Sequence, residues 1–421
     1  MDPGSGQPGP VVSWSVERLD WADDRLGEIE LPKRMMQLRA GFGSGLATRA
    51  GDLPGTVWAV SDRGPNLKVK AAVKLYGLDR LGPLRSEAGA KIMPRPDLGP
   101  AVAELRVGEG EVELVRSFPI ADTCGRAVSG LPAPGGAHAR CEPAFDLDGR
   151  LLEPDPSGLD TEGLAALADG GFWVGDEYGP SLVRLDADGN VVKRLVPAGT
   201  AVDGAAYPVE ARLPAIAARR QLNRGFEAIA LTGDGNWLFL AFQSPLAHPD
   251  EQAHEQGRHV RLWRLHAGTG EIAAQYLYPF DPPETFRRDQ ARQPLRWSDL
   301  KVSELCWAGA AGLLVLERGS QTTKIYAVAP SERFELDPSH LDPATRPTVE
   351  QLSARAGGPD LPVLAKRLLF SSDDAPEIAA DLEGMAILSP SELLLVNDND
   401  FGVEGAETGF WRVRFDPPPF T

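Results

Sequence analysis

The sequence is poor in cysteine, in basic residues and in long apolar runs, and each shortage excludes a class of protein. Three cysteines in 421 residues do not make a disulfide scaffold. The sequence has 43 Lys and Arg against 60 Asp and Glu, which gives a net charge of −17. Proteins that bind nucleic acids generally have a basic surface, so this charge argues against such binding. No stretch approaches the roughly 18–20 apolar residues of a membrane helix. We therefore expect neither a nucleic-acid partner nor a membrane span.

Sustained helical periodicity is also missing, whereas glycine and proline are abundant. The 45 Gly and 37 Pro punctuate the whole chain and separate short runs in which apolar and polar residues alternate. Such runs are typical of strands joined by tight turns. We expect an all-β protein with short helices at Ala71–Tyr76 and Ala211–Arg219.

The two ends of the chain carry different signals. Residues 1–10, MDPGSGQPGP, have neither a basic nor an apolar segment, so they predict a disordered leader and no signal peptide. An exported or periplasmic location is expected only if a signal was removed. Val11–Leu19 and Gly409–Phe415 both alternate like strands. Their pairing would close a ring between the N- and C-termini.

One unit of four short strands recurs along the chain. Four copies place an acid on the first strand, and a weaker copy near the start has a serine there: Glu162, Glu227, Glu304, Glu383 and Ser44. The glutamates lie roughly 65–80 residues apart, and such repeats predict a β-propeller of four-stranded antiparallel blades. Two stacked β-sandwiches are the alternative, but they leave the recurring first-strand motif unexplained.

The number of blades depends on one further hairpin. Val102–Phe118 predicts two strands that either complete the first unit or begin another. We favour six blades, with five as the alternative, closed by the N- and C-terminal strands. A single domain then spans 11–421, with long loop insertions at about 64–100, 119–158, 246–259 and 331–365.

Strand direction brings two sets of polar residues to one mouth of such a ring. The first strand of each blade lines the axis, and it starts at the rim where the antiparallel second strand ends. The first-strand acids should therefore meet the residues that end or follow the second strands: Asp62, Arg63, Asp176, Glu177, Tyr178, Gln243, Glu317, Arg318, Asn397, Asp398 and Asp400.

This acidic mouth favours a bound cation. Gathered carboxylates repel one another, which raises their pKa values unless a cation neutralises them. Oxygen ligands at variable spacing suit Ca²⁺, with Mg²⁺ or Mn²⁺ as alternatives. The predicted metal ligands are Asp62, Asp176, Glu177, Glu304, Glu317, Asn397, Asp398 and Asp400.

Basic and polar residues beside the acids predict contacts to an anionic substrate. Arg63, Arg224, Arg318 and Lys324 either pair with the acids or clamp a phosphate group, which arginine binds through two parallel hydrogen bonds. Tyr178 either packs at the rim or contacts substrate. We assign substrate contacts to Arg224, Tyr178, Gln243 and Lys324.

Other motifs give weaker evidence of function. His254 and Glu255 lack the second histidine four residues along a helix that a zinc protease needs. Cys124 and Cys141 would pair only in an exported protein, and the sequence leaves this open. Cys306 is expected in the core.

Several segments together resemble the family described as having an esterase-like activity of phytase, a β-propeller family. The resemblance covers roughly residues 40–405 and rests on SDRGPN (61–66), DTEGLAALADGGFWVGDEYGPSLVRLDADG (160–189), NRGFEAIAL (223–231), AFQSPL (241–246), LLVLERG (313–319) and EGMAILSPSELLLVNDNDFGV (383–403). The EYGP and NDNDFG elements are specific. Ser303–Glu304–Leu305 departs from the pattern because no glycine follows the acid.

The resemblance implies a propeller similar to calcium-dependent alkaline phytases, with Ca²⁺ in the acidic mouth. One of Glu162, Glu227 and Glu383 would then act as general base, and Arg63 or Arg318 would stabilise the developing charge. The predicted function is a Ca²⁺-dependent phosphoesterase or related ester hydrolase, acting as a monomer on a small anionic or ester substrate.

Two other functions stay open at this point. The first is a non-catalytic binding propeller with structural Ca²⁺. The second is a lactonase-like hydrolase with one axial Ca²⁺, which Asn397 and Asn399 near Glu383 would suit.

Overall fold

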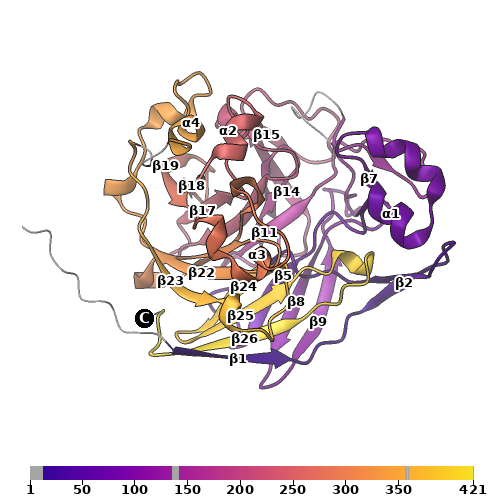
Figure 1. Ribbon diagram of the computed structural model, residues 1–421, viewed down its shortest axis with the longest axis horizontal. Coiled ribbons are helices and arrows are strands. Elements are labelled where there is room, and N and C mark those ends of the chain that lie inside the picture. Colours follow the sequence, from indigo (N-terminus) through magenta and orange to yellow (C-terminus); the bar gives the residue numbers. More distant parts are fainter. Residues whose placement is uncertain (1–12, 135–141, 356–357, 359, 421) are drawn as a thin grey trace, which may run out of the picture.

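The short alternating runs form strands in the computed structural model, which describes residues 13–134, 142–355, 358 and 360–420. The predicted leader 1–10 and Cys141 lie outside the described residues. The all-β class and the four-stranded antiparallel sheets are confirmed. Figure 1 shows these sheets arranged around a centre, with α1 (Val69–Tyr76) and α4 (Val349–Ser353) at the periphery and α3 (Arg287–Gln290) over the middle of the view.

The described residues form five sheets of four or five strands, and four of them take their strands in chain order. The first contains β4 (Gly45–Ala47), β5 (Thr56–Val60), β8 (Ala101–Val107) and β9 (Val112–Pro119). The second contains β11 (Thr161–Ala166), β12 (Phe172–Asp176), β13 (Ser181–Leu185), β14 (Val191–Pro197) and the parallel β15 (Val209–Leu213). The third contains β16 (Phe226–Leu231), β17 (Trp237–Phe242), β18 (His259–His266) and β19 (Ile272–Pro279). The fourth contains β20 (Lys301–Trp307), β21 (Leu313–Arg318), β22 (Thr323–Val328) and β23 (Lys366–Ser371).

The fifth sheet joins the two ends of the chain. It contains β24 (Leu382–Ser389), β25 (Glu392–Asn397), β26 (Phe410–Asp416) and β1 (Ser13–Leu19). β1 pairs antiparallel with β26 from Ser13 opposite Asp416 to Leu19 opposite Phe410. In Figure 1 the indigo first strand lies beside the yellow last strands.

The hairpin that left the number of sheets open belongs to the first sheet. Val102–Phe118 forms most of β8 and β9, and β8 pairs with β5. Beyond the five large sheets, the described part of the chain adds only small ones. These are β2 (Arg25–Ile29) with β3 (Met36–Arg39), and β6 (Leu67–Lys68) with β7 (Lys91–Ile92) and β10 (Ala144–Phe145).

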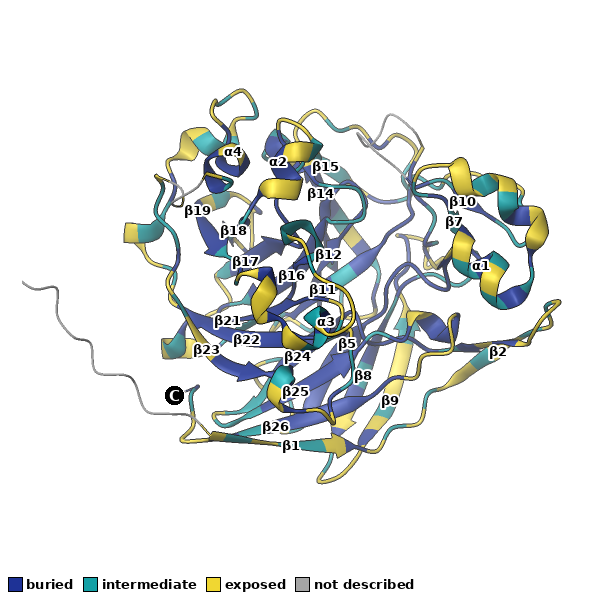
Figure 2. Cartoon of the chain, viewed as in Figure 1, coloured by how far each residue is buried: buried dark blue, intermediate teal, exposed yellow. Residues whose placement is uncertain are grey.

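The first strand of each large sheet is an inner strand. β4 contacts β11, β11 contacts β16, β16 contacts β20, β20 contacts β24, and β24 contacts β4. The strands behind them are also buried, including every residue of β5, β12, β21 and β22 (Figure 2).

Apolar layers fill the space between successive sheets. Trp58 meets Phe172 edge to face at 5.0 Å between ring centroids, Phe239 stacks on Trp307 at 5.8 Å, and Trp14 meets Phe370 at 4.8 Å. Each pair joins two neighbouring sheets, so aromatic packing holds the sheets face to face.

Three of the four α-helices in the described residues lie in the predicted long insertions, and α3 lies between β19 and β20. Segment 64–100 contains α1 (Val69–Tyr76), which includes the predicted helix Ala71–Tyr76, and a 3₁₀ helix at Asp79–Ser86. The predicted helix Ala211–Arg219 is split into the end of β15 and a 3₁₀ turn at Ala215–Arg219. The remaining α-helices are α2 (Glu251–Gln256), α3 (Arg287–Gln290) and α4 (Val349–Ser353). None of the helices in the described residues is long and apolar enough to span a membrane.

Candidate metal centre

The acidic side chains reach one end of the ring because the inner strands bulge at the same position. Strand pairing shifts register at Glu162, Glu227 and Glu383, so each of these residues faces no regular partner on the second strand. A β-bulge re-aims a side chain and is common beside active sites. The bulges therefore turn three carboxylates toward the axis.

The inner strands lie so close together that glycine is required at certain positions. A side chain at Gly163 would place its Cβ 2.6 Å from the carbonyl oxygen of Glu227, and one at Gly45 would lie 2.4 Å from that of Glu162. The residue after the bulged glutamate in β11 must therefore be glycine for the strands to approach this closely.

Three groups of carboxylates each bring their oxygens within 4.8 Å of one another. They are Glu162 with Glu227 and Glu383, Asp160 with Glu162 and Glu177, and Asp62 with Asp398 and Asp400. Glu162 belongs to two of the groups, so these two are continuous. We call these eight residues the acid cluster.

The acid cluster is electrostatically strained. Burial, reinforced by the charge of Glu177, raises the pKa of Glu227 to about 7. Burial also raises the pKa of Asp62 to about 6, and the nearby Asp400 adds to the shift. The pKa of Glu162 lies well above its usual range because of desolvation and the neighbouring Glu227. Carboxyl groups in this state gain most from a nearby cation.

Unusual backbone conformations gather here too. The non-glycine residues with positive φ in the described chain are Asn223, Asp381, Asp400 and Phe401. Asp400 belongs to the acid cluster, Asn223 accepts a hydrogen bond from Arg63, and Asp381 pairs with Arg318. Such strain persists only where the surroundings enforce it, and it is common at functional sites.

The two arginines predicted to act in catalysis are held by carboxylates. Arg63 Nη1 lies 2.6 Å from Glu142 and its Nη2 lies 2.5 Å from Asp160. Arg318 pairs with Glu383 and, at 3.0 Å, with Asp381, while its Nε donates to Ser303 Oγ at 2.8 Å. Both guanidinium groups therefore anchor parts of the acid cluster.

Among the described residues, Arg224 and Lys301 also lie near the acid cluster, and no ion pair is formed by either of them. Arg224 Nη1 is buried and has no hydrogen-bond partner among the described residues. Desolvation, together with the charges of Arg318 and Arg224, lowers the pKa of Lys301 to about 7. Both residues line a cavity of about 700 Å³ that six basic and two acidic side chains surround, which we call the basic cavity: Lys68, Lys70, Arg85, Lys91, Arg224, Lys301, Glu87 and Glu142.

The basic cavity and the acid cluster are neighbours. Lys91 and Lys301 interact electrostatically with Asp400, and Lys301 with Glu227. Asp160 and the cavity-lining Glu142 are joined through Arg63. A ligand could therefore contact both at once.

The chemistry of the unsatisfied atoms fits a hard cation. Buried oxygens without a hydrogen-bond partner in the described residues include Ser44 Oγ, Glu227 Oε2, Gln243 Oε1 and Ser244 Oγ. All of them lie where inner strands start or second strands end. Carboxylate, amide and hydroxyl oxygens are the donors that Ca²⁺ prefers, so the residues present suit it.

Not every predicted site residue joins the acid cluster. Glu304 is one residue out of register, because the bulge in β20 falls at Ser303. The Glu304 carboxylate instead accepts the backbone N–H groups of Leu46 at 2.9 Å and Leu305 at 3.0 Å. It lies among the inner strands and outside the three carboxylate groups.

Strand alternation takes two further predicted residues to another place. Glu317 points away from its neighbour Arg318 and accepts hydrogen bonds from Tyr278 and Lys366, each at 2.6 Å. Lys324, opposite Glu317 in the sheet, pairs with Asp281 at 2.9 Å. Neither residue is brought to the acid cluster.

Three other predicted residues have their polar groups engaged locally. Asp176 pairs with the buried Arg194 at 2.6 Å. The Tyr178 hydroxyl donates to the Gly130 carbonyl at 2.8 Å. Asn397 accepts from Gly409 N–H at 2.7 Å and donates to the carbonyls of Asp398 and Glu407. Gln243 does reach the site, where it hydrogen-bonds Glu227.

Sequence reasoning missed Asp160, Lys301 and Asp381, which share one position. Each lies two residues before a bulged residue: Glu162, Ser303 and Glu383, respectively. Residues two apart on a strand face the same side. The pattern becomes visible only when Ser303, and not Glu304, is aligned with the glutamates.

Comparison with known proteins places the chain among phytase-like sequences. The family model described as "Phytase-like: Esterase-like activity of phytase" matches residues 39–401. An uncharacterized secreted protein of Arthroderma benhamiae is 25% identical over 323 residues, which cover 66% of this chain and 59% of the relative. The chain thus spans less than two thirds of that relative's length.

Solved structures give weaker likenesses. A gluconolactonase from Xanthomonas campestris is 10% identical with a TM-score of 0.34, covering 95% of this chain and 97% of its own. A PQQ-bound aldose sugar dehydrogenase from Streptomyces coelicolor is 12% identical with a TM-score of 0.33, covering 97% and 99%. Scores this low support no conclusion about function.

Proposed function

The chain belongs to the Phytase-like family, described as having the esterase-like activity of phytase, and we propose that it is a divalent-cation-dependent hydrolase of phosphate monoesters. One observation carries this proposal: the acid cluster, which suits a cation, adjoins the basic cavity, which suits an anion. A phosphate ester needs both, because its charge is neutralised partly by metal and partly by basic side chains.

The three carboxylate groups support more than one cation. Asp62, Asp398 and Asp400 would hold one ion, and Asp160, Glu162 and Glu177 another. Ca²⁺ is the favoured ion, because the donors are all oxygen and their arrangement is irregular. When bound, such ions would polarise the phosphate and lower the pKa of a water molecule.

The protein's own residues would orient the ester and move one proton. Arg224 and Lys301 would donate to the phosphate oxygens, since both line the basic cavity. Glu227 would accept a proton from the attacking water, since its Oε2 has no hydrogen-bond partner within the described ranges of the chain. Water oxygen then bonds to phosphorus as the bond to the alcohol oxygen breaks, and the alcohol leaves with a proton from solvent.

The lactonase alternative receives no support from its motivating residues. The Asn397 side-chain amide hydrogen-bonds backbone groups. Asn399 donates to Ala40 O and Thr408 Oγ1, both at 2.9 Å, and accepts from Phe401 N–H at 2.8 Å. The amide oxygen of each therefore already accepts one backbone N–H group.

We also infer that the five large sheets are the blades of one closed five-bladed propeller. Two observations support this: the inner strands contact one another in a continuous ring, and β1 completes the sheet of the C-terminal strands. The sequence had favoured six blades because it could not assign the Val102–Phe118 hairpin to the first unit.

Ester hydrolysis with and without metal tests the proposed activity. We expect p-nitrophenyl phosphate to be cleaved in Ca²⁺ and not after EDTA treatment, and p-nitrophenyl acetate to be a poor substrate. Glu227→Gln should lower kcat by about 10²–10⁴-fold, the usual contribution of a general base. Glu113→Gln, an exposed acid on β9, is the matched control and should behave as wild type.

Two outcomes would reject the proposal. Hydrolysis that EDTA leaves unchanged would remove the role of the cation. A protein that Ca²⁺ stabilises against heat but that cleaves no phosphate ester would be the non-catalytic binding propeller.

The relative's description as secreted supports an extracytoplasmic site of action. We propose that this protein is also exported, where Ca²⁺ concentrations match sites of roughly 10⁻⁴–10⁻³ M affinity. Fractionation of the source cells with an antibody tests this; recovery only in the cytoplasm would contradict it.

A further inference from the structure

The ring of inner strands has a second opening, at the end opposite the acid cluster. Three members of the acid cluster lie near the starts of β11, β16 and β24, whereas later residues of the inner strands line this opening. Glu162 and Ala166 of β11 are four residues apart, or about 13 Å along a strand. The opening leads into a cavity of about 590 Å³, which we call the funnel.

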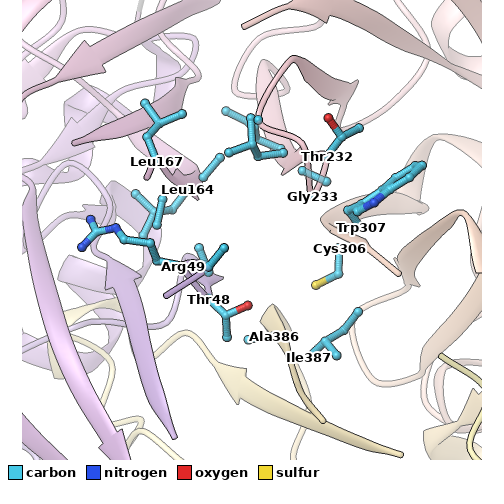
Figure 3. Close-up of a pocket in the computed structure, with 18 of the residues that line it drawn as sticks. Thr48, Arg49, Leu164, Leu167, Thr232, Gly233, Cys306, Trp307, Ala386 and Ile387 are labelled. Carbon is cyan, nitrogen blue, oxygen red and sulfur yellow. The ribbon is translucent and has the colours of Figure 1, made fainter. Parts of the chain in front are cut away.

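Apolar side chains from all five inner strands line the funnel. Leu46, Leu164, Ile229 and Leu305 are buried within it. Half-buried aliphatic and aromatic residues lie nearer the mouth: Leu167, Leu231, Trp307 and Ile387. Figure 3 shows the ring of side chains, with Cys306, Thr48 and Ala386 facing the space between the strands.

The charged residues of the funnel are already engaged. Arg49 donates to the Gly170 carbonyl at 2.6 Å and lies over the ring of Trp58 at 4.4 Å. Asp169 pairs with Arg184 at 2.5 Å, and Asp234 accepts from Thr232 and Asn236. Each charged side chain of the described lining therefore already has a partner within the protein.

Glu304 lies between the two ends of the ring. Its carboxylate binds the N–H groups of Leu46 and Leu305, and both of these residues line the funnel. No member of the acid cluster is among the described residues that line the funnel. The funnel is thus a separate space from the proposed metal centre.

We propose that the funnel binds an uncharged, mostly apolar small molecule. Its volume lies within the roughly 300–1,000 Å³ of ligand pockets, and its lining is mostly apolar as in such pockets. Strands surround the funnel, so a ligand must enter it along the axis of the ring. A flat protein surface could not do this and is excluded as the occupant. Binding of such a ligand would remove the apolar residues at the mouth from water, which is favourable.

Binding of the uncharged probe N-phenyl-1-naphthylamine to the full-length protein tests this proposal. We expect saturable fluorescence enhancement with one probe per chain, unchanged by Ca²⁺ or inorganic phosphate. Ile387→Glu places an unpaired charge in the lining and should weaken probe binding by roughly tenfold or more. Leu368→Glu, the same change at an exposed leucine on β23, should leave binding unchanged.

A second variant guards against misfolding of the first. Thr48 is exposed at the mouth, so Thr48→Trp should block the funnel without disturbing the core. Circular dichroism and phosphate-ester hydrolysis establish that both variants are folded. Absence of saturable binding to the wild type would overturn the proposal, as would wild-type affinity in both folded funnel variants or an equal loss in Leu368→Glu.

Discussion

Arg224 is one of the buried residues whose polar atoms are not all satisfied by the described chain. Neighbouring Arg63 and Arg318 pair with carboxylates, whereas the buried Arg224 Nη1 has no hydrogen-bond partner in the part of the chain that the structure describes. A buried donor left in this state costs stability unless a ligand satisfies it. The sequence identified all three arginines but could not say which were free, because pairing depends on side chains from other sheets.

Substituting Arg224 should therefore affect substrate binding. We expect Arg224→Gln to raise the KM for p-nitrophenyl phosphate by roughly thirtyfold, the equivalent of about 2 kcal/mol for a hydrogen bond to a charged group. Arg296→Gln is the control, since Arg296 is exposed and pairs only with Asp299 in its own turn. Steady-state kinetics of both variants check this, and a lowered kcat at unchanged KM would argue against a binding role.

The acid cluster also predicts a pH dependence. Because burial raises the pKa of Glu227 to about 7, its protonated form favours folding, and that contribution is lost as pH rises from about 4.5 to about 7. Without metal, Glu227→Gln should be more stabilising at pH 8 than at pH 5, by up to about 3 kcal/mol. Thermal unfolding at both pH values in EDTA measures the difference. With Ca²⁺ bound beside Glu227, the difference between the two pH values should shrink, because a nearby cation stabilises the ionised carboxylate.

At the scale of the strand, β-bulges decide which residues meet. The repeat was readable from sequence because each inner strand starts with the same motif. The exact register was not, because a bulge adds one residue without a distinctive composition. In β20 the bulge falls on Ser303, so Glu304 lies outside the acid cluster and Lys301 comes close to Glu227. Glu317 and Lys324 do not reach the acid cluster for a similar reason, because strand alternation turns their side chains to the opposite face of the sheet.

The glycine after the bulge in β11 should be required for the site. Gly163→Ala would place a methyl group 2.6 Å from the Glu227 carbonyl and so push β11 and β16 apart. We expect a lower Tm and weaker Ca²⁺ affinity. Gly110→Ala is the control, since nothing lies within 4 Å of its added methyl group. Calorimetric titration measures the Ca²⁺ affinity of both variants. Equal affinities would show that the close approach of β11 to β16 is not needed for Ca²⁺ binding.

Across the whole molecule, the pairing of β1 with β26 brings the two ends of the chain into one sheet. The sequence predicted this because both terminal segments alternate. The net charge of −17 also gains a structural meaning, since part of it is concentrated at one end of the ring. That concentration opposes folding at neutral pH and favours it once cations bind.

The terminal sheet should depend on Trp14. Its ring packs against Phe370 of the neighbouring sheet, so it helps to hold β1 in place. Trp14→Ala should cost about 2 kcal/mol, less than the 3–5 kcal/mol of a fully buried tryptophan. Leu368→Ala, which removes an exposed side chain of β23, should cost much less. Chemical denaturation compares them; equal losses would mean that the β1 contact adds nothing.

A crystal structure of the protein grown with Ca²⁺ tests the central claim most directly. The account predicts anomalous density for ions among Glu162, Asp160 and Glu177 and among Asp62, Asp398 and Asp400, with Arg224 and Lys301 facing them. Carboxylates without any ion at saturating Ca²⁺, or ions bound only outside the acid cluster, would contradict it.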